Sequence, residues 1–215
     1  MKLFHFKMPP DTGEYAEAIA RGTWAPDPGP GLCPECGHSR QYRVPPLILQ
    51  WMPGSDRVAD FTWAGAGAEV VVTQRVRDVL ESAFKNIRFL GIEIWQPPKL
   101  PRPSDLTRRK KRRVWLPYDG PALWDLQPES RSKIDQNRSN VKLLHVCKTC
   151  GRMIWDIPQY GQRTLVVDRS TWDGAHIFRL DAYPYWVFCT DMAREFIERQ
   201  RFTNVTFELD GIIPD

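Results

Sequence analysis

Two copies of one five-residue cysteine pattern constrain this chain more than any other feature of its sequence. The copies are Cys33-Pro34-Glu35-Cys36-Gly37 and Cys147-Lys148-Thr149-Cys150-Gly151. A Cys-x-x-Cys turn presents two thiolates on one side of a tight loop, and four thiolates complete the tetrahedron that zinc prefers. Glycine after each second cysteine suits a backbone that curls beneath the sulfurs with positive φ. The sequence therefore predicts a closed, structural zinc site with four ligands: Cys33, Cys36, Cys147 and Cys150.

The spacing of these two turns, which we call the first knuckle (33–37) and the second knuckle (147–151), is unusual. Between Cys36 and Cys147 lie 110 residues, whereas zinc ribbons usually have about 15–20 between their pairs. The fold must bring the knuckles together around a long inserted segment. Two alternatives to zinc stay open. They are disulfides, which need an oxidising compartment, and two unrelated turns. A thioredoxin-type redox pair would need a Cys-x-x-Cys at a strand-to-helix junction, and neither copy lies at one.

The fifth cysteine and the histidines have no predicted chemical role. Cys189 lies in an apolar run and is expected to act as a small apolar filler. His38 and His145 flank the knuckles, where we expect them beside the ligands or facing solvent. None of the four histidines has a nucleophile near it in the sequence. We therefore expect no catalytic site and no enzymatic activity.

Composition limits the class of protein. The 215 residues are 42% apolar, which suits a globular chain with a sizeable core, and 19 prolines and 9 tryptophans favour strands and turns over a helical bundle. No run of about 18 apolar residues could span a bilayer. The opening MKLFHFKMPPDTGE lacks the apolar stretch of about 7–15 residues in a secretory signal. We therefore expect a cytoplasmic protein with no membrane partner.

Two stretches of the chain, 70–89 and 186–207, are similar to each other. Each has an apolar run that ends in Thr, then apolar positions at helical spacing, then Asn and an alternating apolar run. Thr73 aligns with Thr190, and after one inserted residue Asn86 aligns with Asn204. We interpret them as related strand–helix–strand units, with chance similarity as the alternative. Neither unit could bury its apolar face alone, so we predict an α+β fold in which the two pack together.

The whole chain, 1–215, is predicted to form a single compact domain. Its expected parts are an N-terminal strand and helix with the first knuckle, the first unit, a basic proline-rich surface excursion, the second knuckle and the second unit, which span residues 1–59, 60–96, 97–140, 141–160 and 175–215. Within the first part, we expect a strand at 3–8 and a short helix at 14–21. Residues 143–146 and 153–157 are expected to be strands that flank the second knuckle as a ribbon-like hairpin.

The positive charge of the chain is concentrated in one segment. Residues 99–113 contain eight basic residues and one acidic residue, which gives this segment a net charge of +7. Because the whole chain has a net charge of +4, the other residues together carry −3. That distribution does not fit a protein that binds nucleic acid over its whole surface. A solvated or partner-facing loop is one interpretation of the segment. The other is a phosphate-binding run made of Arg108, Arg109, Lys110, Lys111, Arg112 and Arg113.

The paired CxxCG knuckles, with Pro30-Gly31-Leu32 leading into the first, resemble the double-CxxCG motif family of myxobacterial immunity proteins of the swarm-inhibition type. The two repeated units also resemble the C-terminal portion common to that family and its relatives, so the likeness covers most of the chain. The resemblance implies a cytoplasmic protein that binds and blocks a cognate polymorphic toxin delivered by kin, many such toxins being nucleases. Only the zinc role carries over, onto Cys33, Cys36, Gly37, Cys147, Cys150 and Gly151; the toxin-binding residues are unknown.

Two functions stay open at this point. The first is an immunity protein that neutralises its toxin by direct binding, because a closed metal site on a rigid body suits recognition by exposed loops. The alternative is a zinc-ribbon nucleic-acid-binding module that uses residues 108–113 and the aromatic side chains beyond them.

Overall fold

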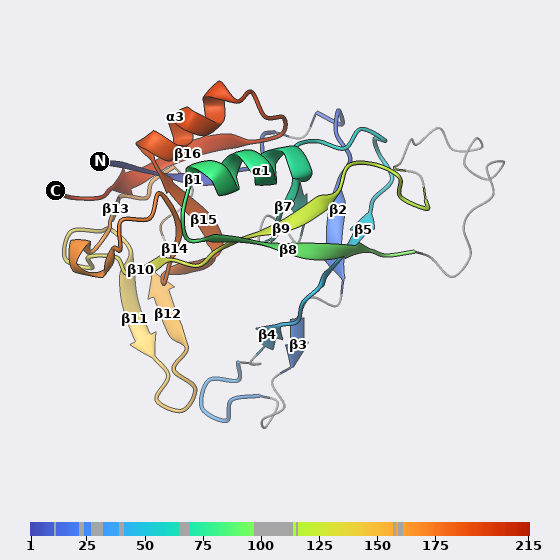
Figure 1. The fold of residues 1–215 in the computed structure, drawn as a ribbon. Coiled ribbons are helices and arrows are strands. Elements are labelled where there is room, and N and C mark those ends of the chain that lie inside the picture. The colour runs from blue at the N-terminus through green and yellow to red at the C-terminus, as the bar shows by residue number, and fades with distance from the viewer. Residues whose placement is uncertain are drawn as a thin grey trace.

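A computed structural model describes residues 1–10, 12–21, 24–26, 32–38, 41–64, 69–96, 114, 116–156, 158 and 161–215. These residues form two six-stranded sheets, two two-stranded ribbons and two α-helices (Figure 1). The predicted α+β class is confirmed at this level. Neither α-helix of the described ranges is long and apolar enough to cross a membrane.

The first sheet has the strand order β2-β5-β8-β9-β7-β6. From β7, the chain passes through α1 (Gln74–Ala83) into β8, and β9 lies between these two strands, antiparallel to both. β5 adds to β8 in parallel. The bounds of the strands are Ala18–Arg21 for β2, Leu47–Trp51 for β5, Phe61–Ala64 for β6, Glu69–Thr73 for β7, Ile87–Ile94 for β8 and Leu123–Pro128 for β9.

The second sheet has the order β10-β14-β15-β1-β16-β13. Here β15 leads through α3 (Asp191–Arg199) into β16, and β1 lies between them, antiparallel to both. β13 adds to β16 in parallel, and a 3-10 turn, η2 (Arg169–Thr171), precedes β14. The strands span Lys2–Lys7 for β1, Arg131–Ser132 for β10, Leu165–Val166 for β13, Ile177–Leu180 for β14, Tyr183–Thr190 for β15 and Thr206–Ile212 for β16.

The ends of the helices follow from local chemistry. Thr190 Oγ1 accepts a hydrogen bond from the Ala193 N–H at 3.3 Å, which satisfies a donor in the first turn of α3. Thr73, before α1, makes no such cap and donates instead to Asp60 Oδ1. After each helix an asparagine takes the left-handed backbone that its short polar side chain tolerates, with φ of 63° at Asn86 and 61° at Asn204.

Both helices pack into one apolar core. Val76 and Leu80 of α1 and Ala193 and Ile197 of α3 are buried in the same cluster, together with side chains of both sheets. Their spacing of four places each pair on one face of its helix. Figure 1 shows both helices on the same side of the molecule. The two sheets are therefore parts of one folded body.

The knuckles lie at the ends of the two ribbons. The first ribbon pairs β3 (Trp24–Pro26) with β4 (Gln41–Arg43), and the second pairs β11 (Lys142–Val146) with β12 (Met153–Asp156). Both ribbons project from the same side of the body, opposite the helices (Figure 1). The expected hairpin around the second knuckle is confirmed.

Two expectations about the fold are wrong. Residues 14–21 do not form a helix: Ala18–Arg21 is strand β2, because pairing with β5 outweighs the helical propensity of its alanines. The segment 97–140 is not surface throughout, since β9 within it is a central strand whose Leu126 is fully buried. The basic residues 108–113 lie outside the described ranges.

Candidate metal centre

Each knuckle is a tight turn closed by the same backbone hydrogen bonds. The Gly37 N–H donates to the Cys33 carbonyl at 2.8 Å, and the Gly151 N–H donates to the Cys147 carbonyl at 2.8 Å. Both glycines have positive φ, 64° and 72°, which explains why the pattern ends in glycine. Each turn holds its two sulfurs on one side of the loop.

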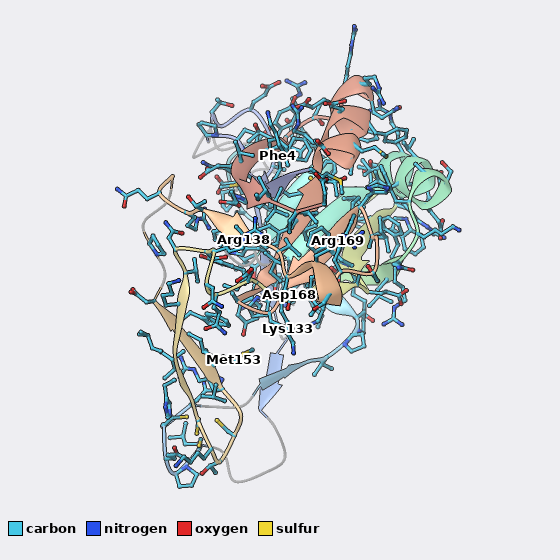
Figure 2. The ribbon with its side chains drawn as sticks, turned by 90° about the vertical axis from the view of Figure 1, so that its left-hand side faces the viewer. Phe4, Lys133, Arg138, Met153, Asp168 and Arg169 are labelled. Atoms are coloured by element: carbon cyan, nitrogen blue, oxygen red, sulfur yellow. The ribbon has the colours of Figure 1, made fainter. Side chains whose placement is uncertain are left out.

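The fold brings the four knuckle sulfurs together, as the sequence predicted. All four Sγ atoms lie within 4.8 Å of one another, and the Cys33–Cys147 and Cys36–Cys150 distances are both 3.6 Å. A tetrahedral ion with metal–sulfur bonds of about 2.3 Å needs sulfurs about 3.8 Å apart. The cluster can therefore hold one metal ion, and its spacing fits zinc. Figure 2 shows yellow sulfur atoms gathered at the far end of the ribbon that carries Met153.

The electrostatics of the cluster favour a cation. The backbone N–H of Cys36, with that of Glu35, lowers the pKa of the Cys33 thiol to about 6. The backbone N–H of Cys150 lowers the pKa of Cys147, but burial and the sulfurs of Cys150 and Cys33 outweigh it and raise that pKa to about 12. The Cys33 thiolate therefore forms easily, whereas a second thiolate at Cys147 is disfavoured. A bound cation would stabilise all four thiolates together.

A polar contact joins the two knuckles outside the sulfurs. The Glu35 carboxylate in the first knuckle accepts hydrogen bonds from the Thr149 hydroxyl at 2.7 Å and from its N–H at 3.1 Å. The hydroxyl bond is the main reason that the pKa of Glu35 is lowered. His145 Nε2 lies 3.8 Å from the same carboxylate, and the histidine side chain is about half exposed to solvent. No pattern in the sequence indicates that Glu35 and Thr149 would meet.

The other residues discussed from the sequence lie elsewhere. Cys189 is completely buried in β15, apart from the four-cysteine cluster, and its burial raises the pKa of the thiol well above the ordinary value. It fills space in the core, as expected. The structure does not describe the alternative nucleic-acid site, 108–113, so it neither supports nor excludes that site.

One buried polar cluster was not predicted from the sequence. His5 Nδ1 is hydrogen-bonded to Asp210 Oδ2, and Arg163 Nη2 lies 3.3 Å from Asp210 Oδ1. The Trp186 ring stacks on His5 with centroids 4.7 Å apart, and the Arg163 guanidinium lies 4.3 Å from the centre of the same ring. These residues come from distant parts of the chain. A histidine in the middle of an apolar strand was the only available signal.

Comparison of the chain with models of protein families finds no match, and comparison with curated proteins finds none either. The metal centre is therefore interpreted from its own geometry.

Proposed function

We propose that this chain is a zinc-binding immunity protein that acts in the cytoplasm and neutralises a cognate polymorphic toxin by binding it directly. The observation that carries the proposal is the four-cysteine cluster built from two knuckles 110 residues apart. This is the pattern on which the resemblance to the double-CxxCG immunity proteins rests.

The chemistry of the cluster favours binding over catalysis. Four sulfurs fill the tetrahedral shell of zinc and leave no position for water or substrate, which is typical of structural sites. The ion would fasten the two ribbons to each other at the knuckles, where the Glu35–Thr149 hydrogen bonds also join them. Ribbons and loops fixed in this way form a rigid platform for recognition of a partner.

The test is protection of cells. The chain is co-expressed with the product of the neighbouring reading frame, and we expect it to restore growth and to purify with that product. Cys150→Ala should abolish protection by removing a metal ligand, whereas Cys189→Ala, the same chemical change outside the cluster, should preserve it. If the wild-type chain neither rescues growth nor binds the neighbouring product, the proposed function is wrong.

The nucleic-acid alternative rests on the net charge of +7 over residues 99–113. It predicts binding of single-stranded oligonucleotides whose logarithmic salt dependence has a slope of about −0.7 per neutralised phosphate. Replacement of the six basic residues 108–113 by serine should abolish this binding. Under the immunity proposal, the same variant still protects cells.

We further propose that the chain is an internal duplication whose halves have exchanged their first strands. The two sheets support this proposal by having corresponding orders: β6-β7-β9-β8-β5 in one and β14-β15-β1-β16-β13 in the other. In both, a helix connects the second strand to the fourth. The middle strand, however, comes from the other half of the chain: β1 precedes the first unit, and β9 precedes the second.

The two sheets correspond most closely in the register of their middle strands, β1 and β9. Leu3 pairs with Thr190 and Leu123 with Thr73, the two threonines that the sequence repeat aligns. Phe6 pairs with Phe207, while Leu126 pairs with Phe89, again an aligned pair. β1 thus occupies in the second sheet the place that β9 occupies in the first. Such an exchange would bind the halves together and bring their knuckles to one metal site.

A further inference from the structure

Apart from the metal centre, the described residues form a concave surface between the β11–β12 ribbon and the body. It consists of two hollows that share Met153, Trp155 and Asp181. We call the one of about 570 Å³ the Arg131 hollow and the one of about 510 Å³ the Asp168 hollow. Figure 2 shows Met153 on the ribbon and Lys133 and Asp168 on the facing part of the body.

The Arg131 hollow has an aromatic lining and a net positive charge, since three arginines and one aspartate, Asp181, line it. Its walls include the rings of Trp155, Tyr183, Tyr185 and Trp186. The buried Arg163 is held there by ion pairs with Asp210 and Glu208. Arg131 and Arg152 also line this hollow and are exposed to solvent, and neither forms an ion pair within the described part of the chain.

The Asp168 hollow has the opposite charge. It is lined by the carboxylates of Asp135, Asp168 and Asp181, against the single ammonium group of Lys133. Leu143, Met153 and Trp155 supply its apolar wall. A ligand that crosses Trp155 would therefore pass from a cationic hollow into an acidic one.

The surface beside the hollows is aliphatic. On the ribbon, Val146 pairs with Met153, and Leu143 pairs with Trp155, so that these side chains share one face. Val146 and Met153 are 44% and 39% exposed, and the neighbouring Leu144 is 64% exposed. This combination suits a peptide. A nucleic acid would bring phosphates to the acidic hollow and lay its backbone over aliphatic side chains.

We propose that the two hollows bind an extended segment of a protein partner that carries an acidic residue, a central aromatic or aliphatic residue and a basic residue, in that order along the groove. The acidic group pairs with Arg131 and Arg152, the central side chain packs among the aromatic rings, and the basic group lies against Asp135 and Asp168. This inference rests on the proposed function, since the toxin is the expected source of the segment.

The experiment uses the full chain and a fluorescein-labelled peptide of seven residues, with two Glu, then Trp-Pro-Leu, then two Lys. Fluorescence polarisation should give a Kd below about 1 mM. R131E/R152E should weaken binding about tenfold or more, because it reverses the charge of two arginines that line the Arg131 hollow. The control R199E/R201E makes the same charge change on exposed side chains away from the groove and should leave Kd unchanged.

A second peptide, with Ala in place of Trp, should bind at least about tenfold more weakly. Absence of wild-type binding at about 1 mM peptide, or equal binding by R131E/R152E, overturns the proposal. Tighter binding of a single-stranded oligonucleotide that R131E/R152E abolishes also overturns it, in favour of a nucleic-acid groove. Peptide binding without toxin neutralisation refutes the proposed function alone. Neutralisation that R131E/R152E leaves intact refutes the groove alone.

Discussion

Separation of the chain into its two proposed halves gives a direct test of the exchanged first strands. The cut lies within residues 97–113, and the products are 1–105 and 106–215. Each piece would leave a gap in its own sheet, since β9 completes the first sheet and β1 the second. We expect the mixed pieces to form a 1:1 complex with the spectroscopic properties of the intact chain.

The expected affinity between the two pieces follows from the apolar side chains that the two exchanged strands bury. Together they bury five apolar side chains, those of Leu3, Phe4, Phe6, Leu123 and Leu126. At about 1.5–3 kcal/mol each, these side chains contribute about 8–15 kcal/mol. Association of two chains costs about 4–15 kcal/mol. The core cluster around both helices and the four-cysteine site add to the favourable side, so the complex should persist at micromolar concentration.

A homodimer of the first piece should be weaker than the mixed complex. In a homodimer of 1–105, β1 of each copy would take the position that β9 occupies in the intact chain. His5 would then replace Asp125, between Val71 and Leu90. It would then lose Asp210, its buried hydrogen-bond partner. A buried polar group without its partner costs about 1–3 kcal/mol, so the mixed complex should displace the 1–105 homodimer.

The assay is size-exclusion chromatography with light scattering, followed by titration of one piece into the other. Leu126→Ala in the second piece removes a fully buried side chain and should cost about 2–5 kcal/mol, or about 30-fold to several thousand-fold in Kd. The control Glu129→Ala changes an exposed side chain just beyond β9 and should alter binding by less than about 0.5 kcal/mol. If 1–105 is a stable monomer that ignores 106–215, the reasoning about strand exchange is refuted.

Three further predictions concern other parts of the molecule. Removal of metal by a strong chelator, or Cys150→Ser, should release one equivalent of zinc and cause partial unfolding, seen by metal analysis and circular dichroism; a chain that retains its fold without metal would contradict this. Gly211→Ala should lower stability by about 3 kcal/mol or more, because its Cβ would lie 1.8 Å from the Leu165 carbonyl oxygen, whereas Gly91→Ala meets nothing within 4 Å and should be near neutral in urea denaturation. The hydrogen bond from Lys7 lowers the pKa of Glu208 from its usual 4.5, so its stabilisation is present above that pH and is lost as pH falls through the lower folded pKa. Lys7→Met should therefore reduce the urea midpoint by a small amount near pH 7 and by less near pH 3; an equal effect at both would exclude this linkage.

The sequence by itself determined the local features of this protein. Five residues suffice to specify a knuckle, because the sulfurs, the turn and the glycine φ all arise within one short loop. Residues 74–83 and 191–199 carry apolar spacing that specifies helices with one buried face. The strands beside the second knuckle were predictable for the same reason, because alternating apolar residues and turn residues are local patterns that span only a few positions.

Only the tertiary structure decided which strands pair and which surfaces result. The β9 segment looked like part of a surface excursion because its partners, β7 and β8, lie more than 25 residues away in the chain. Ala18–Arg21 is a strand because β5 supplies its hydrogen bonds, which no local pattern records. The His5–Asp210 pair and the groove at Trp155 likewise join elements from distant parts of the chain. Pairing between distant strands depends on which partner buries more surface, and that is a property of the whole fold.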